Sequence, residues 1–306
     1  MLKAIGNTPL VQLRRMTPPG SADVWVKLEG VNPTGSYKDR MALAMVDAAQ
    51  ASGELTADMS LLECTGGSTG SSLAFVCAVK GLRFTVISSD AYAREKLDSM
   101  RAYGATVLVE PSIGGKVTPD LWPRMIERAN GLVSDGGYLY LDQFSNPHAP
   151  AGYRQMGEEI LRQLGKPVDA LCGAVGTAGM ITGVGGVIKA AWPEARIVAL
   201  EPDTSPVLSG GEAGTHGIDG TAAGFVPANF DSELVTEVLA LPESKARETA
   251  RRLAQQEGIF AGTSTGLNVL VAIQLAEEIG AGGTVVTAAC DSGFKYLDGP
   301  LFRTAD

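Results

Sequence analysis

The sequence predicts an α/β fold with two open, twisted, mostly parallel sheets that carry helices on both faces. Three observations support this: short apolar or β-branched runs alternate with helical patterns, the alternation occurs in both halves of the chain, and a polar, proline-containing stretch at 142–150 separates the halves. Strands that alternate with helices form parallel βαβ units. A chain of 306 residues with 45% hydrophobic residues can build one large or two medium domains of this kind.

The individual elements are predicted from apolar runs bounded by turn residues and from helical spacing of apolar residues. A long glycine-rich loop at about 203–230 interrupts the second half, and loops of that length are often functional. In chain order we expect strand 60–64, a helix from about Leu73, strand 83–89, helix 93–104, strand 106–111, a helix through 124–130, helix 153–165, strand 169–175, helix 181–192, strand 196–202, strand 234–241, helix 243–258, a helix after Gly266 and strand 284–290.

Charge and composition exclude several classes of function. The 25 basic and 34 acidic residues give a net charge of −9 without a long run of Lys or Arg, so neither nucleic acid nor a membrane surface is an expected partner. No stretch approaches the roughly 20 apolar residues of a membrane span, and a signal peptide is not expected. Four scattered cysteines and two histidines lack metal-site or disulfide spacing, which favours a reducing cytoplasm and no bound metal.

Three glycine-rich loops follow predicted strands, where open α/β sheets bind ligands: TGGSTG (65–70), GTAGM (176–180) and GTSTG (262–266). Two of them contain G-x-S-x-G, around Ser68 and Ser264, which in α/β-hydrolases exposes a nucleophilic serine. Ser264 has no histidine downstream, and the histidines available to Ser68 lie in proline- or glycine-rich loops, so a hydrolase is disfavoured. The GTAGM loop is either a phosphate cradle at a helix N-terminus or a tight turn.

Lys38, in NPTGSYKDR (32–40), is the candidate nucleophile. A lysine in a loop is usually a solvated charge, but this one follows a proline- and glycine-containing turn and precedes an apolar helix that begins near Met41. A position at a helix start disfavours the ammonium form, because the helix dipole places positive potential there. A lysine with a lowered pKa is what Schiff-base chemistry requires.

Further motifs accompany these loops in order along nearly the whole chain. They are IGNTPLVQL (5–13), QFSNP (143–147), AAGFVPANFD (222–231), EGIFAGTSTG (257–266) and DSGFKYL (291–297). With TGGSTG, GTAGM and the highly specific NPTGSYKDR, they resemble the cysteine synthase (O-acetylserine sulfhydrylase) and cystathionine β-synthase family. Its members are fold-type II pyridoxal-phosphate enzymes with a tryptophan synthase β-like fold.

The resemblance implies pyridoxal 5′-phosphate as the cofactor. Lys38 is implied as the residue that forms the Schiff base and then moves the substrate α-proton. Ser264 is implied as the partner of the pyridine nitrogen, where a neutral hydroxyl makes the ring a weaker electron sink and favours β-elimination. The other implied cofactor contacts are Ser68 and, around the phosphate, Gly176, Thr177, Ala178, Gly179 and Met180.

The resemblance also implies how the substrate and the domains are arranged. We expect a smaller, mobile, substrate-binding domain at 37–145 and a larger, cofactor-binding domain at 1–36 plus 146–306. Lys295 and Tyr296 are expected to support the larger domain. The implied contacts of the substrate carboxylate are Thr65, Gly66, Gly67, Ser68, Thr69 and Gln143, and Gly220 is implied near the substrate amine.

The implied reaction is β-replacement on an O-activated serine through an α-aminoacrylate, as in cysteine biosynthesis from O-acetylserine or O-phosphoserine and sulfide. The expected partners are a small amino-acid substrate, sulfide or another small nucleophile, a second copy of the chain in a cytoplasmic homodimer, and a serine acetyltransferase tail. Closure of the smaller domain is expected to exclude water.

Several positions depart from the family pattern where substrates are selected. Ser68 stands where relatives carry asparagine, Gly66 replaces serine, Met180 replaces threonine, and GTAAG (220–224) brings the Thr221 hydroxyl near the substrate. A serine hydroxyl is shorter than an amide and offers one donor instead of two. Three alternative functions therefore remain: a specialised enzyme that forms 2,3-diaminopropionate or cystathionine, a serine or threonine dehydratase, and a cofactor-binding protein without turnover.

Overall fold

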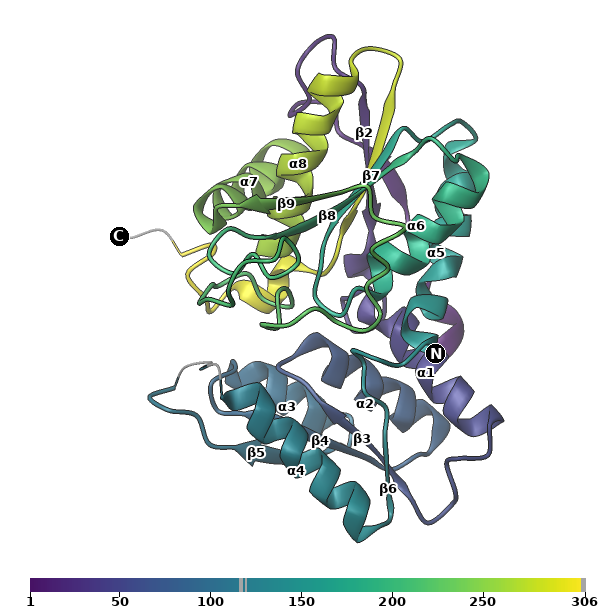
Figure 1. The fold of residues 1–306 in the computed structure, drawn as a ribbon, viewed down its shortest axis with the longest axis vertical. Helices are drawn as coiled ribbons and strands as arrows, with labels where there is room; N and C mark the ends of the chain where they lie inside the picture. The colour runs from purple at the N-terminus through teal and green to yellow at the C-terminus, as the bar shows by residue number, and fades with distance from the viewer. Residues whose placement is uncertain (116–117, 119, 304–306) are drawn as a thin grey trace.

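The computed structural model describes residues 1–115, 118 and 120–303. It contains a six-stranded sheet in the order β1-β2-β10-β7-β8-β9 and a four-stranded sheet in the order β5-β4-β3-β6 (Figure 1). Within the larger sheet β1 pairs antiparallel with β2, and the other described pairs in both sheets are parallel. The predicted fold class, two mostly parallel sheets with helices on both faces, is confirmed.

The larger sheet buries alternate residues of its central strands in two separate cores. Leu171 and Val286 face a core with helices α5 and α6, whereas Cys172 and Val285 face a core with α8. This two-sided burial explains why these strands are continuous apolar runs rather than alternating ones. The elements are β1 (Leu10–Gln12), β2 (Asp23–Leu28), β7 (Ala170–Ala174), β8 (Arg196–Pro202), β9 (Glu237–Leu241), β10 (Thr284–Ala289), α5 (His148–Leu164), α6 (Gly179–Ala191), α7 (Glu243–Glu257) and α8 (Thr263–Ile279).

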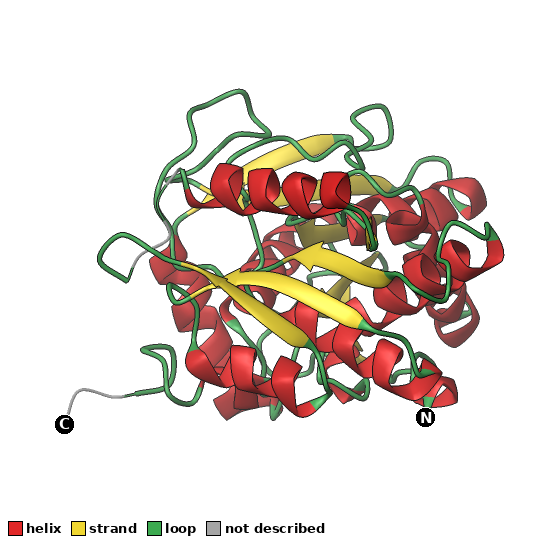
Figure 2. Ribbon diagram, turned by 90° about the horizontal axis from the view of Figure 1, so that it is seen from below, coloured by secondary structure: helices red, strands yellow, loops and turns green. Residues whose placement is uncertain are grey.

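The smaller sheet is covered in the same way, and Figure 2 shows helices on both sides of the strands. Leu62 and Ile87 pack against α4, while Leu61 and Val86 belong to the core shared with α2 and with Met100 of α3. The elements are β3 (Ser60–Cys64), β4 (Phe84–Ser89), β5 (Thr106–Glu110), β6 (Tyr138–Tyr140), α2 (Ser68–Lys80), α3 (Arg94–Ala102) and α4 (Leu121–Asp135). None of the helices described is long and apolar enough to cross a bilayer.

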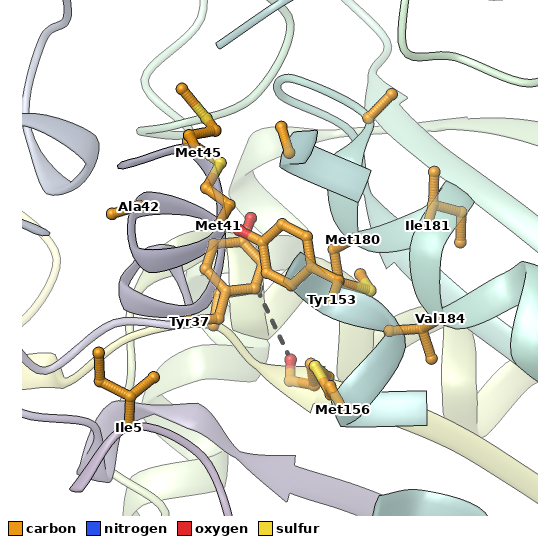
Figure 3. Packing of buried hydrophobic residues seen from close by; sticks show 14 of the residues in the cluster. Ile5, Tyr37, Met41, Ala42, Met45, Tyr153, Met156, Met180, Ile181 and Val184 are labelled. Atoms are coloured by element: carbon orange, nitrogen blue, oxygen red, sulfur yellow. Dashed lines mark hydrogen bonds between the residues drawn. The ribbon is translucent and has the colours of Figure 1, made fainter. Parts of the chain in front are cut away.

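Helix α1 (Lys38–Ala51) lies between the two sheets and packs against both α2 and α5. Met41 and Met45 of α1 share a fully buried core with Tyr153 and Met156 of α5, and Figure 3 shows these side chains together. Tyr37, just before α1, places its ring 5.4 Å from the ring of Tyr153. The residue that follows it, Lys38, is therefore held on a rigid, buried support.

A buried ion network fixes the N-terminal side of α1. The Arg40 guanidinium contacts Glu29 at 2.7 Å and Glu159 at 2.8 Å, and the Lys27 ammonium lies 2.7 Å from Glu159. Thr8 donates a hydrogen bond to Glu29. All four charged side chains are buried. An unpaired charge in the interior costs about 3–5 kcal/mol, so the ionised form of each carboxylate is stabilised by these cations.

Four predicted helix starts were wrong: α5 begins at His148 rather than Tyr153, α8 begins at Thr263 rather than after Gly266, and α1 and α2 also begin earlier than predicted. Helix α1 begins at Lys38 rather than near Met41, and α2 begins at Ser68 rather than near Leu73. The serines, threonine and glycine at the start of α2 are poor helix formers, but packing overrides their propensity. A Cβ atom added to Gly70 would lie 2.6 Å from the Met100 side chain of α3 and 2.7 Å from that of Thr65, so glycine suits the close packing at this point.

Candidate active site

Lys38 is the first residue of α1, and its side chain is buried, with 7% of its surface exposed. The preceding turn is attached to the end of β10 by a bridge between Ser36 and Asp291, and the Lys38 backbone N–H donates to the Ser36 hydroxyl at 3.2 Å. The ammonium lies 5.0 Å from the centroid of the Tyr37 ring. The amine is thus placed where α1 meets the carboxyl edge of the larger sheet.

The pKa of Lys38 is lowered to about 8. Burial is the main cause, because a charged amine loses its hydration there, while Cys290 and Asp291 oppose the shift. The sequence predicted this direction from the helix dipole, but desolvation is the main physical reason. An amine with this pKa is partly neutral near pH 8, and the neutral amine is the nucleophilic form.

The GTAGM loop connects β7 to α6 and brings two distant predicted residues together. A Cβ atom added to Gly176 would lie 2.1 Å from the carbonyl oxygen of Gly220, which belongs to the long loop between β8 and β9. Ala178 has a left-handed φ of 62° at the N-cap of α6, a strained conformation of the kind found at ligand sites. The first N–H groups of α6 lack helical partners and suit an anion such as a phosphate.

The side chains of this loop differ in what they can contribute. Thr177 is buried, and its hydroxyl forms no hydrogen bond within the described part of the chain. Met180 points into the core, since its methyl carbon would lie 2.2 Å from a Cβ added to Gly173 of β7, and Figure 3 shows it beside Tyr153. Met180 can therefore offer a bound anion only its backbone N–H. Gly179 packs against Tyr153: a Cβ atom added to Gly179 would lie 3.0 Å from the Tyr153 ring.

Ser264 lies in the first turn of α8, beside the end of β10. It is buried with 6% exposure and adjoins Cys290, whose thiol pKa is raised to about 12, chiefly by burial. Because β10 and β7 are neighbours in the sheet, Ser264, Lys38 and the GTAGM loop all lie at the same carboxyl edge. Parallel α/β sheets bind ligands at this edge.

The TGGSTG loop lies at the carboxyl end of β3 and enters α2. The Thr69 hydroxyl donates a 2.7 Å hydrogen bond to Oε1 of Gln143, and Gln143 donates through Nε2 to the Cys64 carbonyl at 2.8 Å. The Thr65 hydroxyl accepts from the Gly67 N–H at 3.1 Å. The structure thus brings together Thr65, Thr69 and Gln143, which the family resemblance assigned to one carboxylate site.

Two side chains that the sequence analysis did not single out cover this loop. A Cβ added to Gly66 would lie 2.3 Å from the ring of Tyr92, and one added to Gly67 would lie 2.9 Å from Cδ of Lys96. The glycine that replaces the family serine at 66 is therefore required by Tyr92. Lys96 forms a 2.6 Å ion pair with Asp219, one residue before Gly220, and so joins α3 to the long loop.

Lys295 and Tyr296, expected to support the larger domain, each make a specific side-chain contact. The Lys295 ammonium, in the segment after β10 of the larger sheet, lies 3.3 Å from the hydroxyl of Ser68, the first residue of α2. The Tyr296 hydroxyl donates to Asp291 at 2.6 Å. The only sequence signal for these contacts was their place in the DSGFKYL motif. The Thr221 hydroxyl, predicted near the substrate, is buried and donates to the Ile218 carbonyl at 2.8 Å.

These features can be tested for their fit to a pyridoxal phosphate. A phosphate suits the glycine-lined start of α6, where Gly176 leaves no room for a side chain, and a carbonyl carbon suits the Lys38 amine, whose pKa is low. Ser264 offers a neutral hydroxyl on the adjoining helix. Two mostly parallel sheets, with a buried lysine at the carboxyl edge of the larger one beside a glycine-lined helix start, define the class of α/β enzymes that can hold a phosphate-bearing cofactor on a lysine.

Comparison with known proteins agrees with that class. Residues 1–291 match the model of the pyridoxal-phosphate dependent enzyme family, and the chain belongs to this family. It is 41% identical to cysteine synthase of Staphylococcus aureus, covering 99% of this chain and 96% of that protein. It is 39% identical to O-ureido-L-serine synthase of Streptomyces lavendulae, covering 100% of this chain and 93% of the relative.

Solved structures give the same result. The crystal structure of O-ureido-L-serine synthase superposes with a TM-score of 0.91 at 39% identity, covering 100% of this chain and 95% of that one. The cysteine synthase of Entamoeba histolytica superposes with a TM-score of 0.93 at 33% identity, covering 100% and 90%. The protein is therefore a pyridoxal-phosphate dependent enzyme of the cysteine synthase type of fold.

Proposed function

We propose that this enzyme catalyses β-replacement: it exchanges the oxygen-linked group of an O-activated L-serine for a small nucleophile. The buried, low-pKa amine of Lys38 carries the proposal, because such an amine can take and return a substrate α-proton. Cysteine formation from O-acetylserine or O-phosphoserine and sulfide is the leading candidate, since the Staphylococcus aureus and Entamoeba histolytica relatives are cysteine synthases.

The residues at the edge of the larger sheet would hold the cofactor. Lys38 would bind its carbonyl carbon, Ser264 its ring nitrogen, and the backbone of Gly176, Ala178 and Gly179, with the Thr177 hydroxyl, its phosphate. When bound, the cofactor withdraws electrons from the substrate Cα and so acidifies the α-proton. The Met180 side chain would take no part, because it is packed in the core.

The TGGSTG loop would bind the substrate carboxylate. The start of α2 offers unpaired backbone N–H groups, and the Gln143 amide keeps one N–H free after its bond to Cys64. The Thr65 hydroxyl also remains available as a donor, because its oxygen only accepts from Gly67. Hydrogen-bond donors of this kind suit a carboxylate, because hydrogen bonds to a charged acceptor are the stronger ones.

The proposed reaction, with Lys38 as the proton-transfer group, conserves atoms and electrons. Its neutral amine takes the α-proton, the bond from Cβ to the activated oxygen breaks, and the electron pair leaves with the acetate or phosphate. The nucleophile then forms a bond to Cβ, loses its own proton, and Lys38 returns a proton to Cα. The sum is the exchange of acetate or phosphate for the nucleophile, with no oxidant or reductant.

Closure of a smaller domain, residues 37–145, would exclude water from this exchange. The Lys96–Asp219 ion pair and the Lys295–Ser68 contact support the proposal, because both join the two regions at the substrate loop. A cytoplasmic homodimer is also proposed. The exposed apolar side chains of Met1 and Val31 support it, and sedimentation analysis would test it.

A second candidate is the formation of an O-ureido-L-serine, the product named for the Streptomyces lavendulae relative. The 39% identity over the full chain and the TM-score of 0.91 favour it. Reaction products distinguish the candidates from a serine or threonine dehydratase, which would release a keto acid and ammonia.

The test is to incubate the cofactor-loaded enzyme with O-acetylserine, O-phosphoserine or serine, each with sulfide, and to identify products by mass spectrometry. Cysteine together with stoichiometric acetate or phosphate is the expected result. Release of pyruvate without a replacement product would contradict β-replacement. A Lys38→Ala enzyme is expected to lose turnover, while Lys245→Ala, which changes an exposed lysine, should retain it.

A further inference from the structure

Glu63 of β3 is a buried carboxyl group that the proposed reaction does not use. Its side chain is fully buried, and its pKa is raised well above the usual range, chiefly by burial, with the Asp142 carboxylate adding to the rise. No Lys or Arg in the described part of the chain is paired with it. Instead, Oε1 accepts from the Cys64 N–H at 2.9 Å and Oε2 accepts from the Gln143 N–H at 3.1 Å. Burying a carboxyl group in this way costs free energy, which is typical of a functional position.

The backbone of Gln143 is held from two sides. Its N–H donates to Glu63, and its carbonyl oxygen accepts a 3.0 Å hydrogen bond from Nδ2 of Asn229. The Asn229 N–H also donates to the carbonyl oxygen of the next residue, Phe144, at 3.1 Å. Glu63 lies in the smaller sheet, whereas Asn229 belongs to the long loop between β8 and β9, so the two contacts come from different regions of the fold. We call Glu63 and Asn229 the backbone clamp of Gln143.

The residue before Gln143 shows why its backbone needs such contacts. Asp142 has a left-handed φ of 49°, which residues with a Cβ atom adopt rarely. Its carboxylate accepts from the Phe144 N–H at 3.3 Å and from the Ser145 hydroxyl, so the turn after β6 is sharp. A strained backbone of this kind persists where surrounding contacts hold it, and it is common at ligand sites. The backbone clamp supplies contacts on the residue that follows.

Asn229 also contacts the helix that begins at the GTAGM loop. Its carbonyl oxygen accepts a 2.8 Å hydrogen bond from the Thr182 hydroxyl in the first turn of α6. A continuous series of hydrogen bonds therefore runs from α6 through Asn229 to Gln143, and from the Gln143 side chain to Thr69. Figure 1 shows the chain passing from β6 of the smaller sheet to α5 beside the larger one, and Gln143 lies in this connection. The proposed phosphate site and the proposed carboxylate site are thus joined through Asn229.

We propose that Glu63 and Asn229 are positioning residues for the amino-acid substrate: they fix the backbone of Gln143, so that its free side-chain N–H meets the substrate carboxylate at a set distance from the phosphate cradle. The inference deepens the proposed function and rests on it. Neither residue touches the substrate, and each acts through Gln143.

Hydrogen-bond geometry and charge both explain this role. A hydrogen bond weakens steeply when its angle departs from linearity, so a donor on a mobile backbone binds a carboxylate less well than a fixed one. Thr69 and the Cys64 carbonyl orient the Gln143 amide, but they do not hold its backbone. The raised pKa favours the uncharged form of Glu63, so this contact adds no negative charge beside the substrate carboxylate.

The experiment removes each contact of the backbone clamp without adding a charge. Glu63→Met keeps the length of the side chain but has no acceptor, and Asn229→Leu keeps the size but has no donor. Acetate release from O-acetylserine, with sulfide as the nucleophile, gives kcat and KM for the cofactor-loaded variants. We expect KM to rise about 5-fold or more, the factor that corresponds to one hydrogen bond, with kcat within about 2-fold of wild type.

The decisive comparison repeats both substitutions in a Gln143→Ala enzyme. There the side-chain N–H that the backbone clamp positions is gone, so each substitution should change kcat/KM by less than about 2-fold. Absorbance titration should give a Kd for pyridoxal phosphate within about 2-fold of wild type, because Asn229→Leu keeps the backbone hydrogen bond to Thr182. Glu127→Met and Asn130→Leu are the matched controls, since both residues are exposed on α4, and they should behave as wild type.

Equal falls in kcat/KM with and without the Gln143 side chain would overturn the proposal, because a purely structural role predicts no dependence on that side chain. An unchanged KM in both single variants would overturn it as well. Asn229→Leu, in a loop, carries the test alone where Glu63→Met folds poorly. Wild type that releases no acetate would overturn the proposed function too, whereas a working wild type with losses independent of Gln143 would overturn the backbone clamp only.

Discussion

The Thr69 hydroxyl on α2 donates a 2.7 Å hydrogen bond to Oε1 of Gln143, which follows β6, and both side chains are buried. This contact joins two segments that are 74 residues apart in the sequence. It orients the Gln143 amide so that its oxygen is occupied and one N–H remains free toward the TGGSTG loop. The geometry of the proposed carboxylate site therefore depends on Thr69.

Thr69→Val should weaken binding of the amino-acid substrate. Valine keeps the shape but removes the donor, so Gln143 Oε1 becomes an unpaired buried acceptor and the amide is free to turn. We expect KM for O-acetylserine to rise about 10-fold and the free energy of unfolding to fall by about 1–2 kcal/mol. Steady-state kinetics and urea denaturation measure the two effects. Ser134→Ala, on the exposed face of α4, is the control, and equal KM values for the two variants would contradict the assigned role.

Gly176→Ala should impair cofactor binding. The added methyl group would approach the Gly220 carbonyl to 2.1 Å, which forces the GTAGM loop and the long loop apart. We expect the Kd for pyridoxal phosphate to rise by about 10-fold or more, the factor that corresponds to 1.4 kcal/mol. Absorbance titration of the cofactor-free protein measures it. Gly186→Ala lies in α6 with open space around it, and it should leave Kd unchanged and stabilise the helix by about 0.5–1 kcal/mol.

The lowered pKa of Lys38 predicts a pH-dependent stability of the cofactor-free protein. The unfolded lysine, with a pKa of 10.5, binds a proton that the folded one, at about 8, releases, so the stability of the folded state rises with pH between these values. Below about pH 8 the full penalty applies, on the order of 3 kcal/mol. Lys38→Met should remove it.

Urea denaturation of cofactor-free wild type and Lys38→Met checks this. The variant should be more stable near pH 7, and the difference should shrink as pH approaches about 10.5. A constant difference across that range would show that the Lys38 amine is not desolvated. Lys245→Met, at an exposed position, should follow wild type throughout.

The buried ion network predicts a large effect for Arg40→Met. Loss of the guanidinium leaves Glu29 and Glu159 without their main partner, and breaking a buried pair costs about 3–5 kcal/mol. Arg101→Met, which breaks a half-exposed pair with Asp98, should cost less than about 0.5 kcal/mol. Chemical denaturation of both variants gives the comparison, and similar small losses would contradict the role of the network.

The same network also makes the stability of the folded state depend on pH in acid. The pKa of Glu159 is lowered to about 2 from 4.5, because its hydrogen bonds to Arg40 and Lys27 outweigh burial. A depressed carboxylate pKa stabilises the folded state above pH 4.5, and this contribution is lost as pH falls toward about 2. In Glu159→Gln this part of the acid dependence should be absent.

The fold class and the position of Lys38 could be predicted because they depend on local signals. Alternating strand and helix patterns predict parallel sheets wherever they occur in the chain, and NPTGSYKDR contains its own turn, although the helix start was placed three residues too late. The start of α2 was missed because its serines, threonine and glycine have low helix propensity, which tertiary packing of this buried turn overrides. The inward orientation of the Met180 side chain could not be predicted either, because it depends on the space that Gly173 leaves in the core.

By itself the sequence determined the α/β class, the order of the glycine-rich loops, the family resemblance and the candidate residues, because each is encoded in a contiguous stretch. The tertiary structure alone decided that Gly176 meets Gly220, that Tyr92 requires glycine at 66, and that Lys295 reaches Ser68 while Asp291 Oδ1 stays unpaired. These contacts join segments that only folding brings together, and they depend on ångström-scale space and burial, which no linear pattern encodes.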